Sequence, residues 1–314
     1  MGELGEFGLI AEMAERMAAG PGTVVGIGDD AAVLAAPDGR VVATTDFLLE
    51  GRHFRLDWAG PADIGHRAAV RSLADVAAMG ARPTALLVAF AAPPSLPSSW
   101  ALDLAAGLAA EAERAGATVA GGDTARFDAV LLAVTGLGDL QGRAPVTRSG
   151  AQPGDVVAVA GPLGQSAAGL ALLEAGRREP ATAIAAHLRA SPPYDAGPEA
   201  AELGATALMD VSDGLLADLG HVADGSGVAV DVDPAALDPV PLIPAAVALG
   251  AGHPDGRALE WMLTGGEDHS LVAAFPPATA LPPRWRVIGQ VRAGRGVLVA
   301  GRPHAGPGGW EHFS

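Results

Sequence analysis

Residues 61–91 read PADIGHRAAVRSLADVAAMGARPTALLVAFA, and this stretch decides much of the fold. A Pro-Ala pair opens a long helical pattern that continues to about Met79 and ends at Gly80, because proline suits a first helical turn and glycine suits a helix end. The apolar run 85–91, bounded by prolines, predicts a buried strand. Asp75 is an acid in the apolar C-terminal part of this helix, 73–79, so it is either a functional residue or part of a solvated helix face.

Outward from this stretch, helices and strands follow one another without a regular strand–helix–strand repeat. We therefore predict an α+β fold and not a doubly wound sheet. The Gly- and Pro-containing segment 147–155 is the best domain boundary, which gives domains 1–148 and 149–314. The other predicted strands are 31–34, 41–46, 129–137, 156–160, 207–211, 228–232 and 271–275, and the other helices are 7–19, 102–115, 167–175 and 215–223.

Composition excludes several classes of function. The formal charge is −16, and no basic stripe could neutralise a nucleic-acid backbone. The chain has no Lys, so neither a P-loop nor a protein-kinase lysine is available to hold ATP. It has no Cys, which removes disulfides, thiolate metal sites and a cysteine nucleophile. Without a signal segment or an apolar run of about 18 residues, we expect a cytoplasmic protein with no membrane partner.

Aspartate recurs beside Gly, Ser or Thr at what we predict to be the edges of elements. Magnesium prefers carboxylate, hydroxyl and phosphate oxygens, and converging carboxylates repel one another unless a cation lies between them. We therefore predict a magnesium–phosphate site. Each segment alone is also compatible with an ordinary turn or helix cap, and Asp75 with a solvated helix face. The segments are Gly28-Asp29-Asp30, Thr44-Thr45-Asp46, Asp75, Gly121-Gly122-Asp123 and Asp210-Val211-Ser212-Asp213-Gly214.

Further motifs accompany these segments in a fixed order along nearly the whole chain. They include Gly51-Arg52-His53-Phe54, Thr147-Arg148-Ser149-Gly150, Gly265-Gly266-Glu267-Asp268 and Gly309-Trp310-Glu311-His312-Phe313. In the residues of these motifs and in their order, the sequence resembles the thiamine-monophosphate kinase family. That family belongs to the superfamily of aminoimidazole ribonucleotide synthetase and selenophosphate synthetase. One such motif is weak, but this many in order are specific.

The resemblance implies two α+β domains of the aminoimidazole ribonucleotide synthetase-like fold. It also implies a homodimer whose N-terminal domains share a β-barrel, with nucleotide bound near that interface. The implied reaction converts ATP and thiamine monophosphate into ADP and thiamine diphosphate, with several magnesium ions. The implied magnesium ligands are Asp30, Thr44, Thr45, Asp46, Asp75, Asp123, Asp210 and Asp213. The implied nucleotide contacts are Gly122, Asp123, Arg148 and Ser212, and the implied substrate contacts are His53, Glu267 and Trp310.

The acceptor in this reaction is a phosphate that is already anionic near neutral pH, so no strong base is needed. We therefore assign no covalent nucleophile or general base, and interpret the aspartates as ligands. Trp310 could stack on the cationic substrate or cap the core. His53 could be a turn residue, Glu267 a surface acid and Arg148 a surface charge at the boundary.

Two motifs depart from the family pattern. His269-Ser270 stands where the family usually has Tyr-Glu, and Ser72 and Ala74 stand where Asn and Ser often precede the metal-binding aspartate. Two rival functions remain open. One is another ATP-using enzyme of the superfamily, although those that use cysteine are excluded. The other is a magnesium–nucleotide binding module without turnover, against which the retained aspartates argue.

Overall fold

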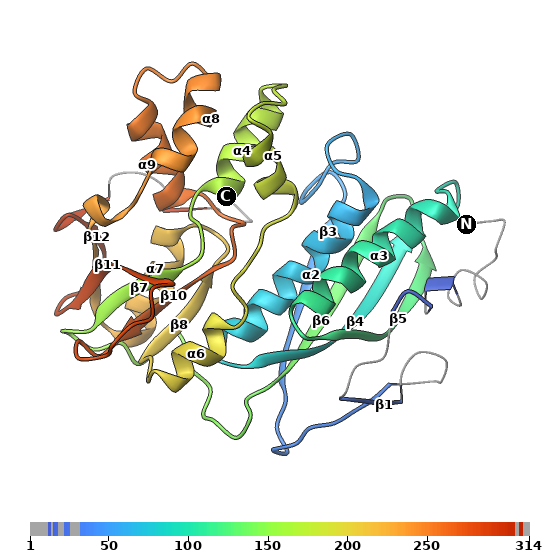
Figure 1. The fold of residues 1–314 in the computed structure, drawn as a ribbon, viewed down its shortest axis with the longest axis horizontal. Helices are drawn as coiled ribbons and strands as arrows, with labels where there is room; N and C mark the ends of the chain where they lie inside the picture. The colour runs from blue at the N-terminus through green and yellow to red at the C-terminus, as the bar shows by residue number, and fades with distance from the viewer. Residues whose placement is uncertain (1–11, 14, 18–21, 26–31, 305–307, 310–314) are drawn as a thin grey trace. The chain divides into compact units, whose positions relative to one another are not determined.

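The computed structural model describes residues 12–13, 15–17, 22–25, 32–304 and 308–309 (Figure 1). The chain divides into two compact units, the first formed by residues 1–77 and 81–143 and the second by residues 78–80 and 144–314. The break after Arg143 lies a few residues before the boundary expected from the sequence. Each unit combines a sheet with helices, as an α+β fold requires.

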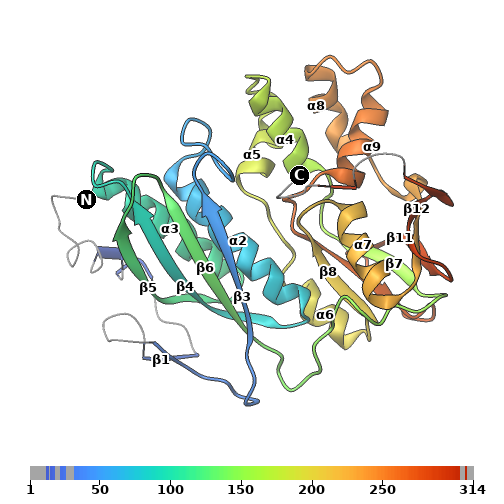
Figure 2. The same cartoon turned by 180° about the vertical axis from the view of Figure 1, so that it is seen from behind.

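Unit 1 is built on a four-stranded sheet with the order β3-β6-β4-β5, in which only the β4–β5 pair is parallel. Two helices cover one face of this sheet in Figure 1, and Figure 2 shows the opposite face of the sheet. A separate two-stranded sheet joins β1 (Thr23–Val25) and β2 (Val33–Leu34). The main elements are β3 (Val42–Leu49), α2 (Pro61–Ala78), β4 (Arg82–Ala92), α3 (Ser98–Arg114), β5 (Thr118–Arg126) and β6 (Leu131–Asp139).

Two glycines allow α2 and α3 to cross closely. A Cβ atom on Gly65 would collide with the backbone of Leu104, and one on Gly107 would collide with the backbone of Ala62. Both helices can therefore lie flat against the sheet, where Leu73 of α2 is completely buried. This packing presses the C-terminal half of α2, which carries Asp75, onto strand β3.

Unit 2 contains a seven-stranded sheet with the order β13-β12-β9-β11-β7-β10-β8. One face shares a large apolar core with α4, α7, α8 and α9. Its strands are β7 (Val156–Ala160), β8 (Ala207–Val211), β9 (Ala229–Val232), β10 (Ser270–Phe275), β11 (Trp285–Arg292), β12 (Gly296–Val299) and β13 (Arg302–Pro303). Its α-helices are α4 (Gln165–Glu174), α5 (Ala181–Leu188), α6 (Ala196–Glu202), α7 (Leu215–Ser226), α8 (Ile243–Ala248) and α9 (Pro254–Thr264).

The structure confirms some predicted elements and corrects others. Strands β7 and β8 have the predicted ends, whereas β11 and α9 were not predicted. The expectation that Thr44-Thr45-Asp46 and Gly121-Gly122-Asp123 lie at the edges of elements was wrong, because both lie inside strands. Parallel pairing with β4 extends β5 through its glycines, and local sequence does not reveal such long-range pairing. The predicted helix 7–19 lies mostly outside the described residues.

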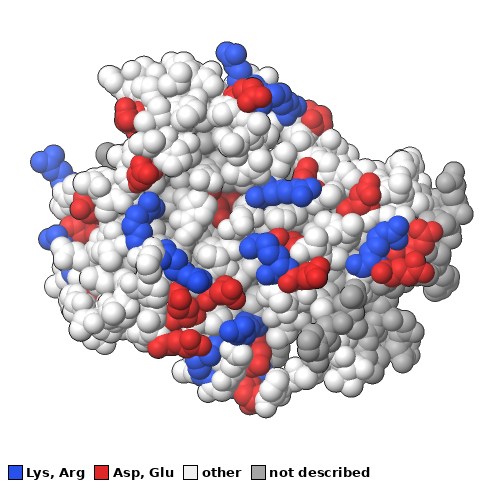
Figure 3. Space-filling view, viewed as in Figure 1, with Lys and Arg blue, Asp and Glu red and all other residues white. Residues whose placement is uncertain are grey.

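Arginine and acidic side chains are interspersed on the face drawn in Figure 3, without a continuous basic strip over the residues described there. This distribution accords with the acidic net charge of the chain. Within the described ranges, no helix is long and apolar enough to cross a membrane.

Candidate functional site

In unit 1, β3 and α2 bring two predicted ligand carboxylates close to hydroxyl groups. Along β3, Thr44 and Asp46 point to the same side, because alternate residues of a strand share a face. Thr44 Oγ1 donates to Asp75 Oδ2 at 2.7 Å, and Ser72 Oγ lies 3.2 Å from Asp46 Oδ2. Arg71 Nη2 lies 3.7 Å from the other oxygen of Asp46. The sheet and the helix thus gather a set of hard oxygen atoms.

Ser72 is one of the positions that depart from the family pattern, and its hydroxyl has a definite role. The side chain is completely buried, and its one hydroxyl proton is shared between the carbonyl oxygen of Val134, 2.9 Å from Oγ, and Asp46 Oδ2. It therefore ties α2 to the sheet immediately beside Asp46. The small side chain of Ala74 is buried and adds no polar group beside Asp75.

Thr45 is separated from its predicted fellow ligands. Its side chain is on the opposite face of β3, where Oγ1 lies 3.2 Å both from the Val134 carbonyl and from the Thr135 hydroxyl. His53 follows β3 in a turn, and its Nδ1 accepts the backbone N–H of Leu49 at 3.0 Å. The neutral ring therefore carries its proton on Nε2, which makes that atom a donor suited to an anion.

Asp123 lies at the other edge of the same sheet. Three strand spacings, about 14 Å, separate β3 from β5. Asp123 pairs with Ala89, whereas Gly122 pairs with the buried Val88 that faces the helices, so Asp123 points to the opposite face from Asp46. Its Oδ1 accepts the N–H of Thr124 at 2.8 Å. Within one chain, Asp46 and Asp123 are therefore not brought together.

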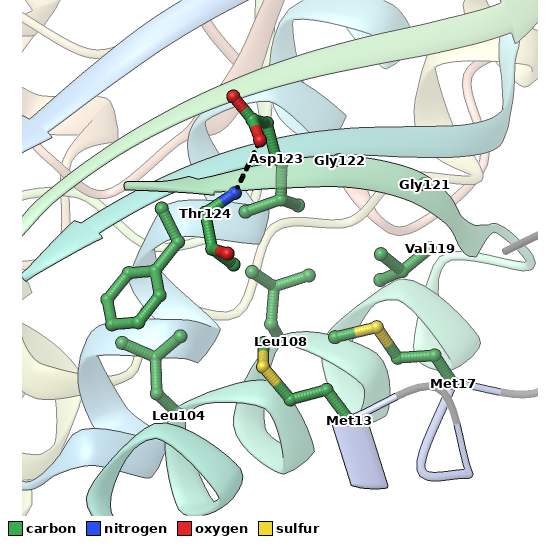
Figure 4. Close-up of a pocket in the computed structure, with 11 residues that line it drawn as sticks. Met13, Met17, Leu104, Leu108, Val119, Gly121, Gly122, Asp123 and Thr124 are labelled. Atoms are coloured by element: carbon green, nitrogen blue, oxygen red, sulfur yellow. Dashed lines mark hydrogen bonds between the residues drawn. The ribbon is translucent and has the colours of Figure 1, made fainter. Parts of the chain in front are cut away.

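An apolar pocket adjoins the glycine pair of β5. In Figure 4, Met13 and Met17 face Leu108 and Val119 across the cavity, while the Asp123 carboxylate points away from it. Val88, Phe90 and Leu104 complete the apolar wall, and Gly121, Gly122 and Thr124 form the polar rim. A flat aromatic group fits such a wall, and a charged group attached to it would emerge beside the glycines.

In unit 2, the loop after β8 is held by a buried acid that the sequence reasoning missed. Asp218, in the first turn of α7, accepts the backbone N–H groups of Ser212, Asp213 and Gly214 through Oδ2 at 3.0, 3.1 and 3.0 Å. An acid in the first turn of a helix is the signal that could have revealed this cap. The loop that carries Asp210, Ser212 and Asp213 is therefore fixed in shape.

The same acid shows that negative charge is concentrated here. Burial, and after it the charges of Asp210 and Asp213, raise the pKa of Asp218 to about 7, although the backbone N–H groups of Gly214 and Asp213 lower it. Asp218 Oδ1 is buried and accepts no hydrogen bond from the described residues. A cation near this loop would relieve the repulsion among the three acids.

The remaining predicted residues of unit 2 lie along the same loop or on the surface. The Glu267 N–H donates to the Ser212 carbonyl at 2.8 Å, which places Glu267 beside the Asp210–Gly214 loop. The Arg148 side chain is exposed, and its carbonyl accepts a hydrogen bond from Ser226 at 3.3 Å. Asp30 and Trp310 lie outside the described residues.

The donor atoms fit magnesium in kind. They are carboxylates and hydroxyls, the hard oxygens that this ion prefers, and Asp218 Oδ1 is a buried oxygen to which the described residues donate no hydrogen bond. Over the described part of the chain, however, no three acidic or histidine side chains converge as a ready-made metal cage. This arrangement suits an ion that keeps waters and substrate phosphates as ligands.

Family models match both halves of the chain. AIR synthase related protein, N-terminal domain, matches residues 28–140, and AIR synthase related protein, C-terminal domain, matches residues 152–300. A protein of Mycobacterium tuberculosis (strain ATCC 25618 / H37Rv) named thiamine-monophosphate kinase is 46% identical over 314 residues, with 99% of this chain and 92% of that protein covered. The chain belongs to the thiamine-monophosphate kinase family.

Solved structures support the same membership. The thiamine-monophosphate kinase of Stenotrophomonas maltophilia K279a is 33% identical, with a TM-score of 0.81 over 96% of this chain and 98% of that chain. A structure described as AaThiL complexed with AMPPCP and TMP is 33% identical, with a TM-score of 0.81 over 100% of this chain and 98% of that chain. The predicted thiamine-monophosphate kinase family and its two-domain α+β fold are confirmed.

Proposed function

We propose that this chain transfers the γ-phosphoryl group of ATP to thiamine monophosphate. A phosphate oxygen of thiamine monophosphate bonds to the γ-phosphorus, and the bond from that phosphorus to the β–γ bridging oxygen breaks. ADP leaves with the electron pair, and thiamine diphosphate forms. The near-full-length likeness to thiamine-monophosphate kinases carries the proposal, and the related structure with AMPPCP and TMP supports it.

The acceptor needs no strong base, because a phosphate monoester has a second pKa of about 6 and is anionic at neutral pH. Repulsion between the two phosphates is the main barrier, so catalysis rests on positioning and charge neutralisation. Bound magnesium supplies that neutralisation. The residues proposed to hold it are Asp30, Thr44, Thr45, Asp46, Asp75, Asp123, Asp210 and Asp213, of which Thr45 and Asp123 lie on the opposite face of the sheet from Thr44 and Asp46. None of them is assigned an acid–base step.

The chain's other groups bind and orient the two substrates. Gly122, Asp123, Arg148 and Ser212 are the proposed nucleotide contacts, and His53, Glu267 and Trp310 the proposed thiamine monophosphate contacts. The His53 Nε2 proton suits a phosphate oxygen, and the Glu267 carboxylate can accept a hydrogen bond from an aminopyrimidine. Arg148 provides a permanent positive charge in a chain without lysine.

The direct test is ADP release measured with ATP, magnesium and thiamine monophosphate, together with detection of thiamine diphosphate. We expect ADP to form in proportion to thiamine diphosphate and only when thiamine monophosphate is present. ADP release that thiamine monophosphate does not stimulate would sink the proposal. Nucleotide binding without any turnover would favour the non-catalytic module instead.

The nucleobase of ATP occupies the apolar pocket beside Gly121 and Gly122 in this proposal. Leu108→Trp should fill this pocket and raise the KM for ATP about 10-fold, which corresponds to ~1.4 kcal/mol. The KM for thiamine monophosphate should stay near that of the wild type. Steady-state kinetics with each substrate varied in turn check this, and Leu56→Trp at an exposed position serves as the control. An unchanged KM for ATP in a folded Leu108→Trp protein would exclude the pocket.

The proposed assembly is a homodimer in which the N-terminal domains, residues 1–148, bind ATP and magnesium and pair through a shared β-barrel. The C-terminal domains, residues 149–314, complete the fold. Two features support this assembly. Phe47 is 58% exposed on the face of the four-stranded sheet away from the helices. Asp123 points to that same face, so a second copy could bring it toward ligands that its own chain holds elsewhere.

Phe47→Asp is expected to turn this dimer into a monomer. A charge at the centre of a buried apolar contact is unfavourable because it loses its hydration without gaining a partner. Light scattering after size exclusion should report half the wild-type mass. Val247→Asp, at a residue equally exposed in unit 2, should keep the wild-type mass. A Phe47→Asp protein that stays dimeric would place the interface elsewhere.

A further inference from the structure

His269, which departs from the family pattern, lies in the core of unit 2 beside a proposed magnesium ligand. Its side chain is 3% exposed, and Nδ1 lies 3.0 Å from Asp210 Oδ2. An ionised carboxylate only accepts hydrogen bonds, so the ring Nδ1–H is the donor in this pair. This hydrogen bond holds Asp210 Oδ2 in place. It thereby also sets the direction in which the second oxygen, Oδ1, points.

The opposite edge of the same ring faces a proposed substrate contact. His269 Nε2 lies 4.0 Å from Glu267 Oε2, and the Glu267 side chain is 29% exposed. The imidazole therefore lies between a carboxylate proposed to bind magnesium and a carboxylate proposed to bind thiamine monophosphate. Nε2 lies beyond hydrogen-bond distance from Glu267, so the ring attracts this acid only when both ring nitrogens carry a proton.

The backbone around the ring is held firmly enough for such a role. Glu267 and His269 both adopt left-handed backbone conformations, with φ values of 65° and 52°, which non-glycine residues seldom adopt. The His269 N–H donates to the Val211 carbonyl at 2.9 Å. Between the two residues, the Asp268 carboxylate accepts the Gly164 and Ser166 N–H groups, at 2.5 and 2.8 Å. Three hydrogen bonds thus hold this unusual backbone conformation in place.

We propose that His269 is a positioning residue that orients Asp210 toward magnesium and links it to Glu267 at the substrate site. This inference rests on the proposed function for the roles of Asp210 and Glu267. The ring takes no part in the phosphoryl transfer itself. It acts as partners behind metal ligands generally do, by fixing the orientation of the ligand.

Two variants separate the two edges of the ring. His269→Phe keeps a flat ring and removes both nitrogen atoms. His269→Asn places an amide N–H near the Nδ1 position and tolerates a positive φ, but has nothing at the Nε2 position. His253→Asn, at an exposed histidine of the same unit, is the matched control.

Magnesium affinity should be measured by calorimetry on the whole protein without nucleotide, so that this readout does not depend on turnover. We expect His269→Phe to weaken magnesium binding about 10- to 100-fold and His269→Asn to restore most of it. In kinetic assays, both variants should show a raised KM for thiamine monophosphate, because both lose the edge toward Glu267. His253→Asn should match the wild type in every measurement.

Wild-type magnesium affinity in His269→Phe would overturn the proposal, as would equal losses in the Phe and Asn variants. Thermal unfolding identifies a variant that fails to fold. If His269→Phe does not fold, His269→Asn tests the proposal by itself, because it should keep most of its magnesium affinity while its KM for thiamine monophosphate rises. A wild-type protein that binds magnesium but ignores thiamine monophosphate would overturn the proposed function instead. The calorimetric measurement of magnesium affinity would still test whether His269 orients Asp210.

Discussion

Asp75→Asn is expected to lower the turnover of thiamine monophosphate about 1000-fold, while the protein stays folded. Asparagine has nearly the same shape, and its carbonyl oxygen can still accept the hydrogen bond that Thr44 donates at 2.7 Å. What the variant loses is the negative charge that holds a cation. Metal-ion stabilisation of a phosphoryl transition state is worth several kcal/mol, and ~4 kcal/mol corresponds to about three powers of ten in rate.

The measurement is coupled ADP release with saturating ATP, magnesium and thiamine monophosphate, alongside thermal unfolding of the same sample. Asp103→Asn, at an exposed aspartate on α3, controls for the loss of one acidic charge from unit 1. It should keep wild-type turnover. If Asp75→Asn also kept wild-type turnover, Asp75 would be only a hydrogen-bond partner of Thr44. The oxygen atoms that β3 and α2 bring together would then not form a magnesium site.

Local patterns were sufficient where one element carries its own signals. The strand ending at Val211, the Asp-Val-Ser-Asp-Gly loop and the helix that starts at Leu215 were all predicted within a few residues. The apolar run of the strand and the glycine before the helix are neighbours in the chain, so no distant contact was needed to recognise them.

Local patterns failed where pairing between distant strands decides the conformation. Gly121-Gly122-Asp123 has the composition of a turn, yet it continues β5 because β4 pairs with it in parallel. For the same reason, sequence could not show that Asp46 and Asp123 lie on opposite faces and at opposite edges of one sheet. Motif order predicted the site residues, but only sheet order and register show which of them can meet within one unit.

Residues that support the site were also invisible in the sequence. Asp218 and His269 both act through proposed ligands on the 210–214 loop, and neither matches a short motif for metal binding. The place of Asp218 in a first helical turn suggests a cap, but its hold on the loop is seen only from the three converging N–H groups. His269 stood out as a departure from the family pattern, and its contact with Asp210 gives that departure a physical meaning.

Asp210→Asn is expected to reduce turnover about 1000-fold and to weaken magnesium binding. As for Asp75, the loss of a metal interaction worth ~4 kcal/mol in the transition state corresponds to about three powers of ten in rate. Asp210 is 3% exposed on β8, and the β-ladder with Leu271 holds its backbone, so the variant should fold. A ligand at a hundredfold excess over its Kd stabilises the folded state by about 2.7 kcal/mol. Magnesium should therefore raise the unfolding temperature of the wild type more than that of the variant.

Asp224→Asn provides the matched control, because Asp224 is exposed on α7 only a few turns from the same loop. It should keep both the turnover and the magnesium-dependent rise in unfolding temperature. Retained turnover in Asp210→Asn would remove the loop of unit 2 from the magnesium site and leave His269 without a ligand to orient. Lost turnover with an unchanged magnesium response would make Asp210 a structural partner of His269. Loss of both, with Asp224→Asn unaffected, is the outcome that a buried carboxylate acting as a magnesium ligand requires.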